Sequence, residues 1–241
     1  MKKHVEYLLK VICYTLFFCL IHSSNVINYL KPNTEENKIY NKNVHLNTTD
    51  FIDFGTTILI SVINIFTSYK LNSSTLSRLY GKDNLGIESL LIHISVSIYE
   101  IFYQVLAEKK WLVLIHHLIL ILWFAYFIYI DIYLYYISTF ALAEITNIFL
   151  VPFLLMKRNK IFLDKVLYIG LGLGISFIFA RLILLPYVYY LSYNDFDDVK
   201  KEDIYNFYAG RIGILIIILM SVFWFYKICN GGIKEYRKLS K

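Results

Sequence analysis

The chain has 241 residues, of which 58% are hydrophobic and only 17% are charged. This balance lies outside the usual range of soluble globular domains and indicates an integral membrane protein. The net charge of +6 is typical of basic loops beside anionic lipid, so we do not interpret it as nucleic-acid binding. The three cysteines show no CxxC spacing, which excludes a sequence signature of a disulfide framework or a zinc site.

Apolar runs recur along the whole chain, and each is close to the roughly 20 residues that cross a bilayer as a helix. The first run, Val11–Leu30, follows several lysines and also fits a cleavable signal peptide, so both interpretations stay open at this point. The other six runs are Phe51–Tyr69, Leu85–Leu106, Trp111–Ile130, Ile132–Met156, Phe162–Leu191 and Phe207–Ile228. We therefore predict an all-α, polytopic membrane bundle of about seven transmembrane helices.

The runs divide the chain into three parts. Residues 1–50 hold the first span, or signal-like segment, and a polar, Asn-rich linker from Lys31 to Asp50; residues 51–234 form the main bundle; residues 235–241 are a short basic tail. The turns at 107–110 and at Asp131 are so short that the third, fourth and fifth helices must be neighbours. Loops on the C-terminal side hold more Lys and Arg than those on the other side, which predicts a cytoplasmic C-terminus.

The third predicted helix carries a stripe of polar side chains. His93, Ser97, Glu100 and Gln104 are spaced i, i+4, i+7 and i+11, which places them on one face of a helix with 3.6 residues per turn. Ionisable groups inside a membrane are costly and usually face a cavity or one another. The alternative is a hydrogen-bonding seam that only holds neighbouring helices together.

A histidine pair, His116-His117, lies about 8 Å inside the fourth predicted helix, counted from Trp111. Neutral imidazole can accept a proton or be acylated, and a carboxylate at its other ring nitrogen would orient it. Glu100 lies at a similar depth in the neighbouring helix and can be that carboxylate. A buried histidine pair can also be purely structural, and both interpretations remain open.

Further polar residues occur in the later spans. Glu144 and Asn147 lie one turn apart near the middle of the fifth span, where they either line a cavity or form a packing contact. Arg181 and Arg211 are expected toward the far end as interfacial anchors, Arg181 also being a candidate for the polar lining. Asp53 is expected to be solvated at the cytoplasmic mouth of the second helix.

No cofactor or metal is predicted. A metal site from the histidines and Glu100 is an alternative that their spacing does not favour, and the sequence contains no HExxH, GxSxG or Walker-type motif.

Four segments in order resemble the TLC-domain family, which includes the ceramide synthases. They are Trp111–Leu120 with the histidine pair, Ala141–Asn147, Phe177–Pro186 and Trp224–Ile228, and the resemblance covers roughly Phe51 to Lys234. It implies a bundle of membrane helices around a lipid-accessible cavity, with a lumenal N-terminus and a cytoplasmic C-terminus. It also implies the endoplasmic reticulum or a related membrane.

The catalytic signature of the family is only partly present. Catalytic ceramide synthases transfer a fatty acyl group from acyl-CoA to a long-chain base, and their signature has two Asp residues just ahead of the His-His pair. Here the approach is Glu108-Lys109-Lys110-Trp111, without Asp, whereas Tyr99-Glu100 resembles the Tyr-Asp of the preceding helix. The chain therefore looks closer to the small TLC-domain proteins linked to membrane phospholipid composition and lipid trafficking.

Our first hypothesis is a protein that binds or senses lipid and takes part in membrane lipid homeostasis. The polar lining of its cavity would comprise His93, Ser97, Glu100, Gln104, His116, His117, Glu144, Asn147 and Arg181. In the alternative, a ceramide-synthase-like N-acyltransferase, His116, His117 and Glu100 are catalytic and acyl-CoA is a substrate. A carrier or channel is the third class, and its polar path would have to cross the whole membrane. Membrane lipid is the expected partner, and a homo-oligomer is compatible with the sequence.

Overall fold

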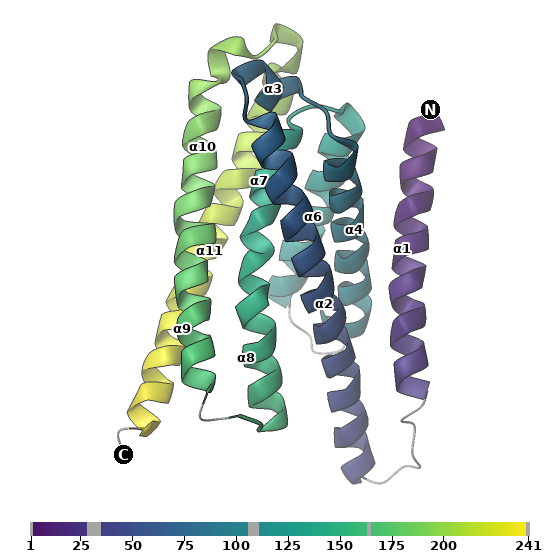
Figure 1. Cartoon of the computed structure of the whole chain (residues 1–241), viewed down its shortest axis with the longest axis vertical. Helices are drawn as coiled ribbons and strands as arrows, with labels where there is room; N and C mark the ends of the chain where they lie inside the picture. Colours follow the sequence, from purple (N-terminus) through teal and green to yellow (C-terminus); the bar gives the residue numbers. More distant parts are fainter. Residues whose placement is uncertain (1, 28–34, 106–110, 163–164, 240–241) are drawn as a thin grey trace.

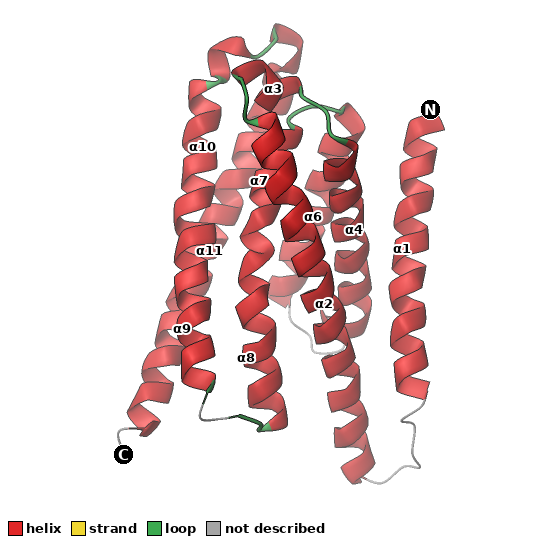
Figure 2. Ribbon diagram, viewed as in Figure 1, coloured by secondary structure: helices red, strands yellow, loops and turns green. Residues whose placement is uncertain are grey.

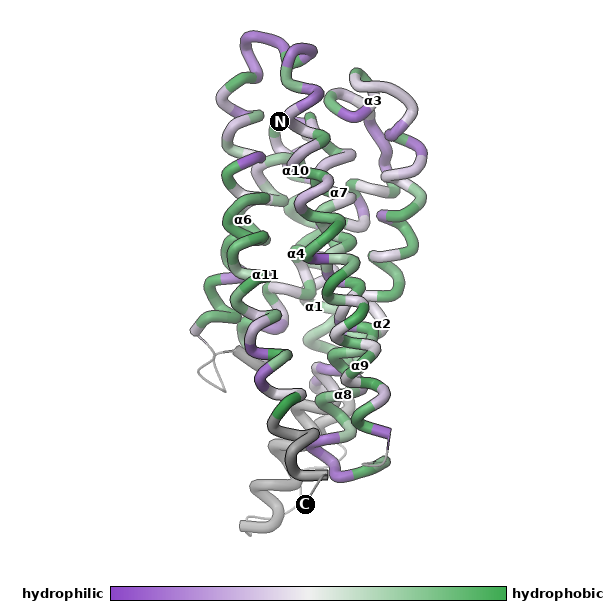
Figure 3. Tube along the Cα trace, turned by 90° about the vertical axis from the view of Figure 1, so that its left-hand side faces the viewer, coloured by the Kyte–Doolittle hydropathy of each residue, from purple (hydrophilic) through white to green (hydrophobic). Residues whose placement is uncertain are grey.

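The computed structural model of the chain describes the backbone of residues 2–27, 35–105, 111–162 and 165–239. It describes the side chains of 3–23, 48–103, 111–162 and 165–233. Helices make up nearly all of this described part, which contains no strand (Figure 2). Seven of the helical stretches are long and apolar enough to cross a membrane, which confirms the predicted all-α membrane bundle. Hydrophobic residues follow the lengths of the spans, and hydrophilic residues gather at the two ends (Figure 3).

Some spans are single helices and others are joined from several segments. The α-helices are α1 (Lys2–Ile27), α2 (Glu35–Leu71), α3 (Thr75–Tyr80), α4 (Asn84–Glu100), α6 (Trp111–Ile130), α7 (Leu134–Ala141), α8 (Asn147–Asn159), α9 (Val166–Phe177), α10 (Leu185–Asn194) and α11 (Ile204–Leu239). Two π-helices, η1 (Ile101–Val105) and η3 (Ile178–Leu184), and three 3₁₀ segments, η2 (Leu142–Thr146), η4 (Phe196–Asp198) and η5 (Lys201–Asp203), complete the described elements. The fifth span is α7-η2-α8 and the sixth is α9-η3-α10.

Helix α2 differs from the expected pattern at its start. It begins at Glu35, within the interval that we interpreted as a polar linker. From Glu35 to Asp50 the sequence contains neither Pro nor Gly, so no residue interrupts the helix before it reaches the apolar run.

Helix α1 lies at the outer edge of the bundle and packs along α4 (Figure 1). Lys10 forms an ion pair with Glu88, whose carboxylate also accepts a hydrogen bond from the Tyr14 hydroxyl at 3.1 Å. Near the other end of α1, His22 Nδ1 lies 2.6 Å from the Tyr99 hydroxyl oxygen. Polar pairs at two heights therefore hold this peripheral helix against its neighbour.

Aromatic rings fill the half of the bundle nearer to α3. Trp123 contacts Phe140 and Phe127 edge to face, with ring centroids 4.6 and 5.9 Å apart. Helix α11 approaches this cluster through Gly213, where an added Cβ atom would lie 2.5 Å from the Trp123 ring. Only a residue without a side chain allows so close an approach, which fixes α11 against α6 in this half.

Charged side chains connect the loops at the α3 end of the bundle. The Arg78 guanidinium donates two hydrogen bonds to Asp195, at 2.6 and 2.5 Å, and the Tyr136 hydroxyl donates to the same carboxylate. In the turn between α6 and α7, Asp131 forms ion pairs with Lys82 and Lys3. Burial raises the pKa of the Asp131 carboxyl, but the hydrogen bonds from these lysines outweigh burial and hold the pKa below its usual value.

Candidate functional site

A cavity of about 300 Å³ lies in the half of the bundle nearer to the C-terminal end of α11. Residues from α2, α4, α6, α8, α9 and α11 and from the segments η2 and η3 line it. Helix α1 contributes none of the lining residues. The volume falls at the lower end of the range of small-molecule pockets.

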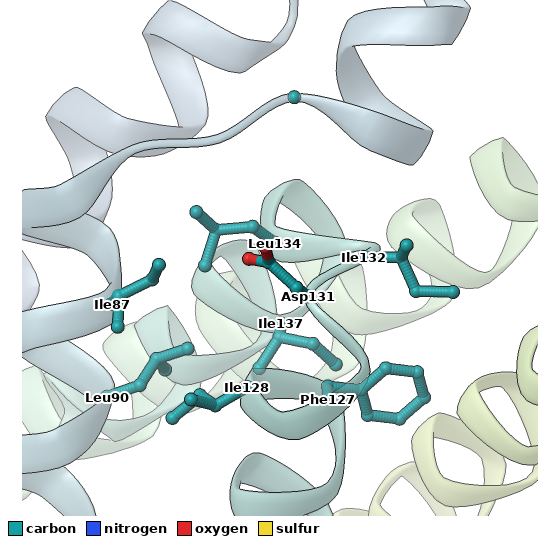
Figure 4. Close-up of a pocket in the computed structure, with 9 residues that line it drawn as sticks. Ile87, Leu90, Phe127, Ile128, Asp131, Ile132, Leu134 and Ile137 are labelled. Atoms are coloured by element: carbon teal, nitrogen blue, oxygen red, sulfur yellow. The ribbon is translucent and has the colours of Figure 1, made fainter. Parts of the chain in front are cut away.

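Three further hollows among the described residues are much smaller, at about 10 to 20 Å³ each. Figure 4 shows one of about 10 Å³ beside the α6–α7 turn, between aliphatic side chains such as Ile87, Leu90 and Ile137. It is barely large enough for one water molecule and belongs to the packed core.

The first ionisable pair at the cavity connects helices α4 and α6. His117 Nε2 lies 3.4 Å from Glu100 Oε2, and both side chains are nearly buried. Both residues also line the cavity. The structure thus brings the predicted carboxylate to one of the two predicted histidines.

The second group extends from α6 to η3. His116 Nε2 lies 3.6 Å from Glu144 Oε1, and Arg181 Nη2 donates a hydrogen bond to the same oxygen at 2.8 Å. Arg181 Nε also donates to the Ala143 carbonyl at 3.2 Å. The Trp224 ring, from α11, packs edge-on against the His116 ring. The Arg181 guanidinium carbon lies 5.5 Å from the centroid of the Trp224 ring.

The expectation that Arg181 is an interfacial anchor is wrong. Its side chain is 3% exposed and paired with Glu144 inside the bundle. A membrane-buried guanidinium is stable there because a carboxylate and backbone oxygen compensate its lost hydration.

The interpretation of Asp53 as a solvated residue is also wrong. Asp53 lines the cavity, where it accepts a hydrogen bond from Thr57 at 3.1 Å and contacts Asn147 Nδ2 at 3.4 Å. Asn147 Nδ2 also lies 3.4 Å from Glu144, so it connects the two carboxylates.

Sequence reasoning did not single out Asp50, Arg158 or Trp224 as site residues. Asp50 lines the cavity and accepts a hydrogen bond from Arg158 at 2.6 Å. The signal that could have found Asp50 and Asp53 is their i, i+3 spacing at the start of an apolar run, which places both on one face of α2. Trp224 carries no such signal, because its role depends on how α11 packs.

Two other predicted lining residues, His93 and Ser97, do not line the main cavity but a small hollow beside it. This hollow, of about 20 Å³, adjoins the main cavity and shares Asp53, Glu100, His117, Glu144 and Asn147 with it. His93 and Ser97 line this hollow, with the His93 ring edge-on to Phe124. The side chain of Gln104 lies outside the described residues.

Irregular helical segments coincide with three of the charged groups. The π-helix η1 begins directly after Glu100, the 3₁₀ segment η2 contains Glu144, and the π-helix η3 contains Arg181. Segments of this kind change the angle between successive side chains and are frequent at functional sites. At this site, side chains beyond each irregular segment therefore lie on a different helix face from the one that a regular α-helix would give them.

The apolar part of the lining comes mainly from α8, α9 and α11. Its members include Leu150, Val151, Leu154, Leu173, Phe177 and Ile228. The exposed residue Lys227 also lines the cavity, near the end of the last span. The lining therefore combines polar and ionisable side chains, mainly from α2, α4, α6, η2 and η3, with apolar side chains, mainly from α8, α9 and α11.

Within the described side chains, no group of three or more His, Cys, Asp and Glu residues is arranged to hold a metal ion. Ionisable side chains at this end of the bundle instead face oppositely ionising partners. His117 faces Glu100, Arg181 faces Glu144 and Arg158 faces Asp50.

Comparison with known proteins gives a family. The sequence profile of the TLC domain matches residues 15–230, from within α1 to near the end of α11. Searches of curated proteins and of solved structures find no match to the chain. Because the profile covers most of the sequence and the helices span a membrane, the chain is an integral membrane protein that belongs to the TLC-domain family.

Proposed function

We propose that the cavity binds one lipid molecule and that the protein acts in lipid binding, sensing or homeostasis. The observation that carries this proposal is a lining that combines charged and polar groups with apolar side chains inside a bundle of membrane helices. A lipid has the same combination, with a polar head and an apolar chain. We place the protein in the endoplasmic reticulum or a related membrane, with its C-terminus in the cytoplasm.

The polar and ionisable part of the lining offers hydrogen-bonding groups to a polar head. Glu144 and Asp53 face each other through Asn147, and both border the cavity. Charges inside a bilayer cost free energy unless they are paired or hydrated. A lipid head group beside this part of the lining would shield these groups from the hydrocarbon around the bundle.

The apolar part of the lining provides the matching surface for an acyl chain. Leu150 and Leu154 lie one turn apart on α8, and Leu173 and Phe177 lie one turn apart on α9, where Leu173 and Phe177 are 5% and 4% exposed. Each pair therefore presents one helix face to the cavity. Burial of a chain against these side chains would supply the main favourable free energy of binding, at about 25 cal/mol per Å² of apolar surface.

Filling the cavity tests this proposal. We expect the purified protein to carry close to one lipid per chain, and the variant Leu173→Trp to lose it because an indole ring occupies the space beside the apolar lining. Quantitative mass spectrometry of lipids extracted after purification measures the ratio. The matched control is Ile175→Trp, two residues further along α9 on its outer surface, where the isoleucine is 57% exposed.

The control variant should keep its lipid. An empty wild-type protein, or equal lipid content in Leu173→Trp and Ile175→Trp, contradicts the proposal. Thermal unfolding of both variants in detergent shows whether each one is folded.

Acyl transfer is a second candidate function, and the pair of His117 and Glu100 at 3.4 Å is the observation that favours it. With Nε2 facing a carboxylate, the neutral ring holds its proton on Nε2 and its lone pair on Nδ1. His117 or His116 would act as a base or acyl acceptor, and Glu100 would orient the ring. The Nδ1 atoms of both rings are buried in this structure, so lipid binding is the function that the geometry supports more directly.

A further inference from the structure

Arg211 differs from the other arginines whose side chains are described. Arg78, Arg158 and Arg181 each contact a carboxylate oxygen, at 2.5, 2.6 and 2.8 Å. Arg211 has neither a hydrogen bond nor an ion pair among the described side chains, and its Nε atom is buried without a partner. A guanidinium in a transmembrane helix normally has a compensating anion.

Aromatic rings take the place of a carboxylate around Arg211. The guanidinium carbon lies 4.6 Å from the Tyr189 ring centroid, 5.5 Å from that of Tyr193 and 6.0 Å from that of Phe207. Tyr189 and Tyr193 lie one turn apart on α10, and Tyr193 is 64% exposed at the outer surface. Rings of this kind orient a cation and stabilise it in part, but they leave its hydrogen-bond donors unused.

Nearby acidic residues do not provide the missing anion. The connection between α10 and α11 contains Asp195, Asp197, Asp198, Glu202 and Asp203, yet none of them forms an ion pair with Arg211. The carboxylate of Asp195 is already bound by Arg78 and Tyr136. Among the described side chains, the Arg211 guanidinium therefore contacts rings of α10 and α11 and forms no ion pair.

The depth of Arg211 fits the boundary between lipid head groups and hydrocarbon. It is the eighth residue of α11, so its Cα atom lies about 10 Å along the helix from Ile204. A long arginine side chain can extend from this depth toward the membrane surface. The phosphate of a lipid is the anion present at that level, and it matches the donor geometry of a guanidinium.

We propose that Arg211, held by Tyr189 and Tyr193, binds the phosphate of a membrane lipid in the leaflet at the α3 end of the bundle. This site is separate from the cavity, which lies in the other half of the membrane and is lined by other residues. It would fix a head group against the junction of α10 and α11.

Native mass spectrometry with added lipids tests the proposal. Dioleoylphosphatidylglycerol should bind to the wild-type protein more tightly than dioleoylglycerol, which has the same chains without phosphate. Arg211→Gln should weaken phosphatidylglycerol binding roughly fivefold, since one cation at a membrane surface contributes about 1 kcal/mol. Arg211→Lys, which keeps the charge but not the planar donor geometry of the guanidinium, should retain more of the binding than Arg211→Gln.

The matched control is Lys201→Gln, which removes an exposed cation in the same connection and should leave phosphatidylglycerol binding unchanged. Equal binding of the two lipids to the wild-type protein overturns the proposal, and so does unaltered binding by Arg211→Gln. Displacement of the lipid by millimolar inorganic phosphate would identify a site for a soluble anion instead. Because the comparison of the two lipids uses only the wild-type protein, equal binding overturns the proposal even if a variant does not fold.

Discussion

In a Glu144→Gln variant, we expect the free energy of unfolding to fall by about 3–5 kcal/mol, as on breaking other buried ion pairs. Glu144 contacts Arg181 at 2.8 Å and lies 3.6 Å from His116 Nε2. Neutralising it leaves the Arg181 guanidinium, which is only 3% exposed, without its anion. The loss follows from this unpaired buried cation rather than from a change in side-chain volume.

Reversible unfolding in detergent micelles measures this effect, and a double variant identifies its cause. Glu144→Gln combined with Arg181→Gln removes both charges and should recover much of the lost stability. Glu202→Gln changes an exposed carboxylate and serves as the control. A fall of less than about 0.5 kcal/mol in the single variant would show that the pair does not stabilise the bundle.

The second large effect concerns acyl transfer. If the cavity carries out this reaction, the purified protein will form a labelled amide from long-chain acyl-CoA and a long-chain base, and His117→Ala will lower the rate at least about 100-fold. The imidazole would take the proton of the attacking amine or carry the acyl group, and alanine can do neither. Glu100→Gln should also lower the rate, because the amide cannot stabilise a charged imidazole as a carboxylate does.

The lipid content of the same preparations separates the two functions. Amide formation that His116→Ala and His117→Ala both leave unchanged would exclude the histidines from catalysis. Absence of amide in a wild-type protein that carries a lipid would leave binding as the function of the cavity. A variant at Ile175 on the outer surface should change neither measurement.

The seven spans could be predicted because the thickness of the bilayer's hydrocarbon core sets the length of each apolar helix, independently of how the helices pack. The hairpin between α4 and α6 could be predicted from the short turn after Leu106, and the distances of Glu100 and His117 from that turn placed both at one depth. The contact between these two residues follows from that shared depth. Chain connectivity and helix rise were sufficient here.

The directions of Arg181 and Asp53 could not be predicted in the same way. A regular helix rotates 100° per residue, but Arg181 lies in the π-helix η3, where this rotation does not hold, so the sequence could not decide between an interfacial anchor and a side chain that lines the cavity. A second π-helix, η1, begins at Ile101. The predicted polar stripe from His93 to Gln104 therefore does not keep the period of an α-helix as far as Gln104. Asp53 lies near the start of its apolar run, and its spacing from Asp50 gives only a shared helix face; the contact with Asn147 on α8 shows that this face points inward.

Photo-crosslinking tests the central claim most directly, namely that a lipid occupies the cavity lined by the ionisable pairs and the apolar side chains. A lipid with a diazirine in its acyl chain, incubated with the purified protein and irradiated, is expected to label Leu154, Leu173 or Phe177. His117→Phe should reduce this labelling because it removes the polar contact for the head group. Labelling confined to outward-facing residues such as Ile175 and Leu171 would contradict the claim.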